Sequence, residues 1–401
     1  MIKMNERIPG RNAKEIYKLI RTQGVALKAD LLEKSKLTVS TLTRILEELI
    51  SLGLILEAGF GESTGGRKPI LYKINPAYAH VFGLDISRTY SKLILFDLDL
   101  KIVDTVRWSM TTSMTPEKLI NEIIYAVQTM MTNHNIALAS CLGMGIGAVG
   151  PLDRTQGIIR SPKYFPANGW SNVPICQMIE EPFGFPVMLD NGTNTSILGE
   201  YWASSQYRYQ HLLYVTAGVG IRSSMMTSGK VVYGAVDMEG SIGQMIIQTD
   251  GPPPREPGGN YGSLESYVSI YALEQKAQSL LKSGRKCMLN ELVYAPEDVR
   301  FHHLLYALNE KDPLAVEIFT QSATCFGIGL ANVLNILHPE HVILGGPLID
   351  TNDLFFAIAK EVALEKTYDS PSYSVEFSRG KLGSDGIATG AAVMMINQLT
   401  E

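Results

Sequence analysis

The stretch DNGTNTSILGE, residues 190–200, is the part of the sequence that most clearly indicates the fold. It follows the short apolar run PVML and leads into a segment that we expect to be helical. A strand, a polar turn and a helix in this order are a common way for α/β proteins to present side chains to a small ligand. Asp190 and Asn191 can both hydrogen-bond hydroxyl groups, whereas Gly192 has no side chain to offer. The stretch therefore raises the question whether this turn catalyses a reaction or only binds.

Apolar runs on both sides of this stretch predict two rounds of a similar β-β-β-α-β pattern. After Pro76, VFGLDIS, KLILFDLD and KIVDTVRW read as strands, PEKLINEIIYAVQTMMTNH as a helix and CLGMGIGAVG as a further strand. HLLYVTAG, SSMMTSG and HVILGGPL are the corresponding strands later in the chain. In each half a glycine-bearing turn follows a strand, where α/β sheets tend to bind ligands. We therefore predict an α/β body over residues 76–401, with lobes at roughly 76–200 and 201–401.

The first 75 residues have a different pattern, which predicts three helices and a hairpin. RNAKEIYKLIRTQG, ALKADLLEKSK and STLTRILEELISLG read as helices, and LILEAG and PILYKIN as strands. In the third helix Leu42, Ile45, Leu46 and Leu49 lie at i, i+3, i+4 and i+7, and Gly53 is placed to end it. Residues 1–75 are therefore predicted to form a winged helix-turn-helix.

Polar residues at the start of the third helix and at the hairpin tip are the candidate DNA contacts. A recognition helix contacts base edges and phosphates with its N-terminal residues, and an arginine at a wing tip suits a narrow minor groove. The candidates are Thr38, Ser40, Thr41, Thr43 and Arg44 in the helix, and Gly66, Arg67 and Lys68 in the wing. The alternative is a winged helix used for protein contacts, or simply a solvated basic face.

Charge and composition favour a DNA-binding end on a globular body. The first 75 residues hold 13 Lys or Arg and 8 Asp or Glu, although the whole chain has a net charge of −5. A basic end on an acidic body suggests that the end meets a polyanion. No apolar run reaches the roughly 18 residues of a membrane span, and the first 20 residues lack the features of a signal peptide. The four scattered cysteines fit a reduced, cytoplasmic setting.

Eight phrases, in order, resemble the ROK family (repressors, open reading frames, kinases), in its regulator branch with an N-terminal winged helix. They are STGGRKPILYKINP, FGLDIS, GIGAVGPLD, DNGTNTSILGE, TAGVGI, GSIGQM, GSLESY and VILGGPL. The resemblance implies a duplicated actin-like, hexokinase-like (ribonuclease H-like) α/β body. It also implies one of two activities, because the family's kinases phosphorylate sugars with ATP and its regulators bind operator DNA in response to a sugar.

Departures from the family pattern argue against a kinase. In the family's kinases an Asp beside the conserved Asn takes the proton from the sugar, and Gly192 occupies that position here. A positioned base contributes about 10²- to 10⁴-fold in rate. Asp190, two residues back, is the only nearby carboxylate that could replace it, and we consider this rescue the minor alternative. We therefore predict no catalytic residue.

Both phosphate loops of the kinases are also altered. The first, Asp-x-Gly-Gly-Thr in the kinases, has Ser87 and Arg88 at the glycine positions, and the second has Val219 and Arg222 where Thr and Gly are usual. Glycines in such loops allow backbone N–H groups to approach phosphate oxygens, and these side chains obstruct that approach. No ATP is expected. The glycines of VILGGPL remain, for which close strand–helix packing is the favoured reason.

The zinc pattern of the family is missing as well. Gln244 replaces its His, Ser263 replaces its last Cys, and no Cys lies between them. Since zinc needs about four close His, Cys or carboxylate ligands, we predict no metal and no cofactor. The Pro- and Gly-rich loop PPPREPGGNYG is expected to fold through turn geometry alone.

Enough polar positions remain for a neutral sugar or cyclic polyol. The candidate ligand contacts are Asn191 and Glu265, which match the family, Ser241 and Gln244, which replace a Glu and a His, and Asp190. These replacements make glucose and N-acetylglucosamine doubtful as ligands, and a vestigial pocket is the alternative. The prediction is a cytoplasmic, homodimeric or homotetrameric repressor of carbohydrate genes that binds double-stranded operator DNA and a sugar effector. The alternatives are a sugar kinase with a DNA-binding head and a regulator controlled by another protein.

Overall fold

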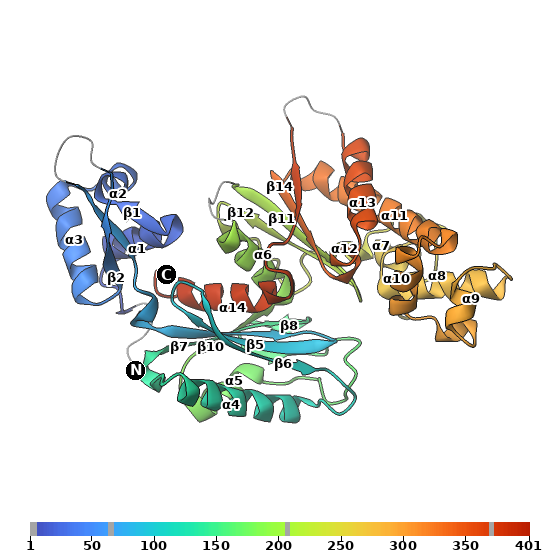
Figure 1. Cartoon of the computed structure of the whole chain (residues 1–401), viewed down its shortest axis with the longest axis horizontal. Coiled ribbons are helices and arrows are strands. Elements are labelled where there is room, and N and C mark those ends of the chain that lie inside the picture. Colours follow the sequence, from blue (N-terminus) through green and yellow to red (C-terminus); the bar gives the residue numbers. More distant parts are fainter. Residues whose placement is uncertain (1–5, 63–67, 205–208, 369–372) are drawn as a thin grey trace. The chain divides into compact units, whose positions relative to one another are not determined.

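The computed structural model describes residues 6–62, 68–204, 209–368 and 373–401, which form two compact units. The second unit is Tyr209–Gly383, and the first contains the preceding residues together with Ser384–Glu401. Figure 1 shows the whole chain coloured from the N-terminus to the C-terminus. The family body predicted from the sequence is confirmed as an α/β fold, and each unit is described below by itself.

The N-terminal part of the first unit is a winged helix. Its elements are α1 (Arg11–Gln23), β1 (Val25–Leu27), α2 (Lys28–Ser35), α3 (Val39–Ser51), β2 (Ile55–Phe60) and β3 (Ile70–Ile74). The strands form an antiparallel sheet in the order β1-β3-β2. The apolar face predicted for α3 is buried, which explains why this helix packs where it does. The predicted start of the second helix was wrong, because Ala26 and Leu27 pair with β3 before α2 begins.

The rest of the first unit is built on a five-stranded sheet with the order β10-β7-β4-β5-β6. The strands are β4 (His80–Ile86), β5 (Tyr90–Asp97), β6 (Ile102–Ser109), β7 (Cys141–Ala148) and β10 (Val187–Asn191). β4, β5 and β6 are antiparallel neighbours, whereas β7 runs parallel to β4 and β10 parallel to β7. Helices α4 (Pro116–Asn133) and α5 (Ile175–Phe183) cover one face, and α14 (Gly386–Asn397) lies on the other (Figure 1). α6 (Gly192–Ala203) packs along α14.

The second unit repeats this sheet topology. Its sheet has the order β13-β12-β11-β14-β15, with strands β11 (His211–Ala217), β12 (Ile221–Thr227), β13 (Lys230–Val231), β14 (His341–Gly345) and β15 (Glu376–Arg379). β11, β12 and β13 are antiparallel, β14 runs parallel to β11, and β15 parallel to β14. The duplication predicted from the two β-β-β-α-β rounds is therefore present in the strand order itself.

Helices of the second unit form its core with this sheet. They are α7 (Leu264–Tyr267), α8 (Ile270–Lys282), α9 (Leu289–Leu292), α10 (Phe301–Asn309), α11 (Pro313–Leu337), α12 (Pro347–Asp350) and α13 (Asp353–Lys366). α11 is long and apolar enough to span a membrane by length and composition, but 61% of its most apolar window is buried inside the protein. It packs mainly against α13, as expected of a central core helix.

The C-terminal segment corrects the predicted lobe boundaries. Residues 384–401 belong to the first unit and not to a lobe of residues 201–401. Small residues allow α14 to lie very close to the first sheet, since a Cβ on Gly83 would meet the carbonyl oxygen of Ala388 at 2.0 Å and one on Gly145 that of Ala391 at 1.9 Å. The winged helix also shares a buried apolar cluster with this sheet and with α14, so residue 75 does not separate two compact units.

Candidate functional site

At the start of α3, the hydroxyl of Thr38 is bonded to two neighbouring hydroxyls. Thr38 is the N-cap, and its Oγ1 accepts a hydrogen bond from the backbone N–H of Thr41 at 3.3 Å. The same oxygen lies 3.2 Å from the Ser40 hydroxyl and 2.8 Å from the Thr41 hydroxyl. Thr38 therefore has a structural role that satisfies one of the free N–H groups of the helix, in addition to its predicted place in the DNA interface.

Thr43 and Arg44 lie one turn further along α3 and differ in their engagement. The Thr43 hydroxyl donates to the carbonyl oxygen of Val39 at 2.7 Å and accepts from Nζ of Lys28 at 2.6 Å. Arg44 is exposed, and the described part of the chain gives its guanidinium no hydrogen-bond or ion-pair partner. Arg44 is thus the predicted contact most free to reach a nucleic acid.

Two residues of this surface were missed by the sequence reasoning. Lys28 escaped because it was placed inside a predicted helix, and only the fold brings it to Thr43. Val39 escaped because the predicted third helix begins at Ser40, whereas α3 begins at Val39, whose side chain is 60% exposed. In the wing, Lys68 is exposed, whereas Gly66 and Arg67 lie outside the described residues.

The polar stretch that opens the sequence analysis is the end of β10 and the first turns of α6. Asn191 is the N-cap of α6, and its Oδ1 accepts hydrogen bonds from the backbone N–H and the hydroxyl of Thr193, at 3.1 and 2.8 Å. Asp190 accepts from the backbone N–H of Asn191 at 2.6 Å and from Nδ2 of Asn194 at 3.0 Å. Its carboxylate also lies 3.7 Å from the guanidinium of Arg154. Both predicted ligand contacts are almost fully buried and already hold local structure.

Gly192 is the first residue of α6, and it faces apolar and backbone atoms. A Cβ at this position would lie 3.3 Å from Cδ1 of Ile387 and 3.7 Å from the carbonyl oxygen of Ala148. The backbone of Gly192 does not need a positive φ, so glycine is not required here by conformation. Backbone strain therefore does not explain why a glycine, and not a residue with a carboxylate, occupies position 192.

The other three predicted ligand contacts lie together in the second unit. Oε2 of Glu265 accepts a hydrogen bond from the backbone N–H of Ile221 at 3.0 Å and would be 3.2 Å from a Cβ on Gly243. Gln244, next to Gly243, is exposed, and the Ser241 hydroxyl donates to the carbonyl oxygen of Met238 at 2.7 Å. Glu265 therefore connects the turn that carries Gln244 with the altered second phosphate loop.

The two altered phosphate loops hold their arginines in local contacts. Nε of Arg88 donates to the carbonyl oxygen of Lys163 at 2.9 Å, and Nη2 of Arg222 lies 3.2 Å from the carboxylate of the buried Asp237. In the first loop Ser87 donates to the fully buried Asp85 at 2.5 Å. Burial raises the pKa of Asp85 to about 7, against the opposing effects of Ser87 and nearby positive charges.

The glycines of VILGGPL have structural reasons to be glycines. A Cβ on Gly345 would meet the hydroxyl oxygen of Tyr214 at 2.6 Å. Gly346 has a φ of +93°, and a Cβ there would meet the carbonyl oxygen of Ala217 at 2.6 Å. Close packing between β14, β11 and the start of α12 is therefore sufficient to explain both residues.

Residues 244–263, where the family resemblance would place a zinc loop, are organised by backbone and side-chain hydrogen bonds. Ile246 and Ser263 form an isolated antiparallel bridge, and the Tyr267 hydroxyl donates to Oε1 of Gln248 at 2.8 Å. Gly262 has a φ of +63° and lies so close to Gln248 that no side chain fits. Among the described residues, no group of three or more His, Cys, Asp or Glu is arranged to hold a metal ion.

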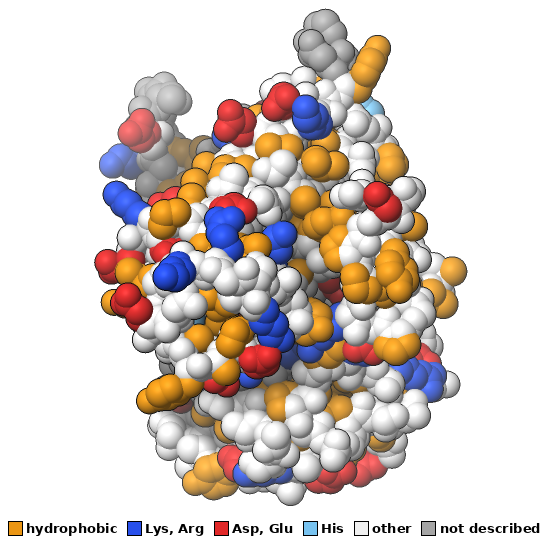
Figure 2. Space-filling model, turned by 90° about the vertical axis from the view of Figure 1, so that its right-hand side faces the viewer, with side chains coloured by type: hydrophobic (Ala, Val, Ile, Leu, Met, Phe, Trp, Pro, Cys, Tyr) orange, Lys and Arg blue, Asp and Glu red, His pale blue; other side chains and the backbone are white. Residues whose placement is uncertain are grey.

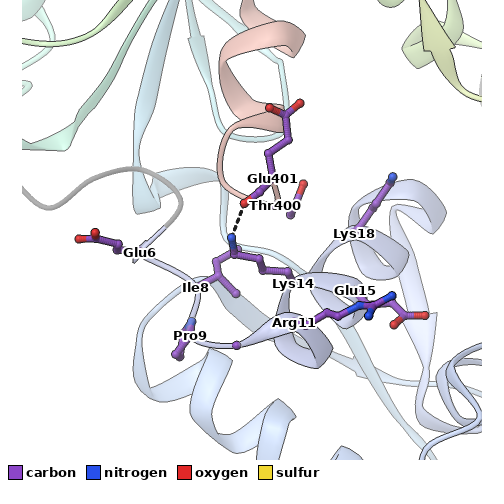
Figure 3. A pocket seen from close by; sticks show the side chains of 10 residues that line it. Glu6, Ile8, Pro9, Arg11, Lys14, Glu15, Lys18, Thr400 and Glu401 are labelled. Carbon is purple, nitrogen blue, oxygen red and sulfur yellow. Dashed lines mark hydrogen bonds between the residues drawn. The ribbon is translucent and has the colours of Figure 1, made fainter.

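A pocket of about 740 Å³ lies in the first unit, between the start of α1 and the end of the chain (Figure 3). Its lining mixes the basic residues Arg11, Lys14 and Lys18 with the acidic residues Glu6, Glu15 and Glu401. Nζ of Lys14 donates to the backbone oxygen of Glu401 across it. None of the predicted ligand contacts lines this pocket, so it is separate from the candidate sugar site.

Exposed hydrophobic side chains occur in both units. The face in Figure 2 shows hydrophobic side chains interspersed with charged and other polar groups. In the second unit, Tyr233, Val236 and Met238 are exposed in the segment before Ser241. Such residues are available for contacts with another chain, but their exposure alone does not identify one.

Comparison with known proteins agrees with the fold. The model of the ROK family matches residues 81–398. A putative xylose repressor of Caldicellulosiruptor sp. (strain Rt8B.4) is 28% identical over 94% of this chain and 93% of its own length. A glucokinase of Thermotoga maritima is 26% identical over 78% of this chain and 96% of its own length. The repressor thus aligns with nearly the whole chain, whereas the kinase leaves about a fifth of it unmatched.

A solved structure gives the same picture of the fold. The crystal structure of a ROK family transcriptional regulator, a homolog of the E. coli MLC protein, has a TM-score of 0.80 and 21% identity. It covers 98% of this chain, and this chain covers 97% of it. With the family model and the repressor relative spanning the residues described above, the chain belongs to the ROK family as one of its transcriptional regulators.

Proposed function

We propose that this protein is a sugar-responsive repressor that binds operator DNA through α3 and the wing and has no kinase activity. The observation that carries the proposal is the exposed Arg44 at the start of α3. A winged helix contacts the major groove with residues near the N-terminus of its recognition helix, and Arg44 is such a residue. Its guanidinium has no partner among the described residues. The double-stranded operator is read by the residues predicted from the sequence, with Thr38 acting also as the helix cap.

The absence of phosphotransfer is supported by three separate sites. Gly192 has no carboxylate, and the nearby Asp190 is held by Asn191, Asn194 and Arg154. Arg88 and Arg222 occupy the phosphate loops and are anchored there by neighbouring groups. Phosphotransfer from ATP needs the catalytic base and both phosphate loops, and all three differ from the kinase pattern here.

A neutral sugar is the effector that best suits the remaining polar groups. Gln244 is exposed, and Glu265 and Asn191 keep the residue types of the family's sugar contacts. The repressor relative is named for xylose, so a pentose is the first candidate. The effector would act by preferring one conformation of the protein and thereby changing its affinity for DNA.

The DNA proposal is tested by equilibrium binding of the full-length protein to duplexes enriched from a random-sequence pool. Arg44→Ala should weaken binding about 5- to 150-fold if Arg44 reads a base, because a good base contact contributes about 1–3 kcal/mol. Arg285→Ala is the matched control, since Arg285 pairs with Glu317 at 2.8 Å on the second unit. Equal affinity of Arg44→Ala and wild type at moderate salt would contradict the assignment.

The effector proposal is tested by thermal melting against pentoses, hexoses, sugar phosphates and inositols. A ligand at 100 times its dissociation constant adds about 2.7 kcal/mol to the unfolding free energy and raises the melting midpoint visibly. Loss of the response in Gln244→Ala would place the ligand at the candidate site. No response across the panel would favour control by a protein partner.

The kinase alternative predicts sugar-dependent ATP hydrolysis. Under our proposal, purified protein should show none above background with any member of the same panel. Turnover that disappears in Asp190→Asn would show that Asp190 acts as the base, and the repressor would then be an enzyme as well.

We also propose a cytoplasmic homodimer or homotetramer, because operators are commonly palindromic and read by paired heads. Sedimentation of the free protein tests this, and a monomer would contradict it.

A further inference from the structure

Val39 is an apolar side chain in a position where the fold gives it no structural purpose. It is the first residue of α3 and is 60% exposed, whereas the apolar face of the same helix is buried. The hydrophobic contact that commonly fixes the entry of a helix joins the residue before the cap to the fourth helical residue. Here these are Leu37 and Leu42, which lie in the same apolar cluster, so Val39 is not needed for it.

The residues in line with Val39 do not form a phosphate-binding surface. At i+4 and i+8 from Val39, Thr43 and Glu47 continue the same row along the helix. Glu47 is exposed and would be repelled by a DNA backbone. A row with an apolar group, a hydroxyl and a carboxylate fits the floor of a groove, where base edges present methyl groups and hydrogen-bonding atoms.

The polar neighbours of Val39 are held in place by contacts within the head. The hydroxyls of Ser40 and Thr41 each bond with that of Thr38, and Thr43 is held by Lys28 and by the helix backbone. These contacts fix the first turn of α3 without involving the Val39 side chain. Val39 is therefore presented on a rigid turn, which favours a specific contact over a loose one.

We propose that Val39 is a specificity-determining residue that packs against the 5-methyl group of a thymine in the operator major groove. The inference rests on the proposed function, because it needs α3 to enter DNA. Only thymine presents a methyl group in that groove, and apolar side chains are its usual partners. Val39 would thus distinguish T·A from the other base pairs at one position of each half-site, while Arg44 reads a polar edge.

The experiment replaces each thymine of the enriched duplex in turn by 2′-deoxyuridine, which removes only the methyl group. The wild-type full-length protein should lose about fourfold in affinity at one thymine per half-site, the effect of one buried methyl group. Val39→Ala should bind the thymine duplex about fourfold or more weakly and show no further loss with uracil at that position. Val25→Ala removes the same atoms from an exposed valine of β1 and should keep the full wild-type sensitivity.

The outcomes separate this inference from the proposed function. Wild-type protein that binds a specific duplex but is indifferent to every thymine methyl group would overturn the role of Val39 and leave the DNA proposal standing. A Val39→Ala variant that loses affinity equally at every uracil would do the same. Failure of the wild-type protein to select any duplex would overturn both. Equal melting midpoints of the two valine variants verify that folding is not the cause.

Discussion

Helices α3 and α6 begin in the same way and end up with opposite roles. Each follows a side-chain N-cap, Thr38 or Asn191, and each has several small polar residues in its first two turns. In α3 the first-turn side chains are partly or fully exposed, whereas in α6 every residue from Gly192 to Glu200 is buried. Similar local sequence therefore presents an exposed surface in one case and fills the interior in the other.

The difference lies in what covers each helix. α6 is packed along α14, and its hydroxyls turn to its own backbone, as when Ser196 donates to the carbonyl oxygen of Gly192 at 2.8 Å. Buried polar groups must find such partners because an unsatisfied group costs about 1–3 kcal/mol. α3 buries only its leucine and isoleucine face, so its other side chains remain available for a partner. Substitutions that change one contact at a time test this difference between the two helices.

The largest effect is expected from Gly390→Ala, in the contact between α14 and α6. A Cβ at Gly390 would lie 1.6 Å from the carbonyl oxygen of Thr195, so the two helices would have to separate. We expect a loss of about 3 kcal/mol or more in unfolding free energy. Gly192→Ala is the matched control, since its Cβ would be tight only against the flexible end of Ile387, at 3.3 Å, and it should cost less than about 1 kcal/mol. Equal denaturant midpoints for the two variants would show that α14 does not hold α6 in place.

The next effect is expected from Asp190→Ala at the buried end of β10. Removing the carboxylate leaves the backbone N–H of Asn191 and the amide of Asn194 without this acceptor, at a cost of about 2 kcal/mol. Glu47→Ala, on the exposed face of α3, should change stability by less than about 0.5 kcal/mol. The measurement is denaturation of both variants under identical conditions. A comparable loss at Glu47 would erase the contrast between the two helices.

The smallest effect is expected from the two caps. Asn191→Ala should cost about 1.5 kcal/mol and Thr38→Ala about 0.5 kcal/mol, because the first cap is buried and the second is exposed. Amide hydrogen exchange of Thr193 and Thr41 reports the loss of each cap locally, since these N–H groups donate to the caps. A larger increase in exchange rate at Thr41 than at Thr193, each measured against the wild-type protein, would reverse the expected order.

Much of this fold follows from periodicity along the chain. The apolar spacing of Leu42, Ile45, Leu46 and Leu49 predicts α3 and its buried face, and both are present. The runs from VFGLDIS to CLGMGIGAVG likewise predict β4 to β7, and the later runs predict β11, β12 and β14. Their repetition predicts the duplicated sheet, although the short strands β13 and β15 were not predicted. Local patterns are sufficient here because each element must bury one apolar face.

The destination of the last helix could not be read in the same way. α14 is apolar almost all round, so its pattern gives no face and no partner. Only the folded chain shows that it returns to the first sheet, where Gly83 and Gly145 leave room for its backbone. The predicted second lobe was therefore too long at its C-terminal end.

By itself, the sequence determined the winged helix and the duplicated α/β body, and it supplied the candidate site residues and the glycine at position 192. These are properties of residue type and spacing, which are set along the chain. Only the tertiary structure decided that Asp190 and Asn191 are bonded inside the first unit and that the side chains of Arg44 and Val39 are exposed. Burial and hydrogen-bond partnership depend on which distant segment covers a side chain, and that is fixed only when the chain is folded.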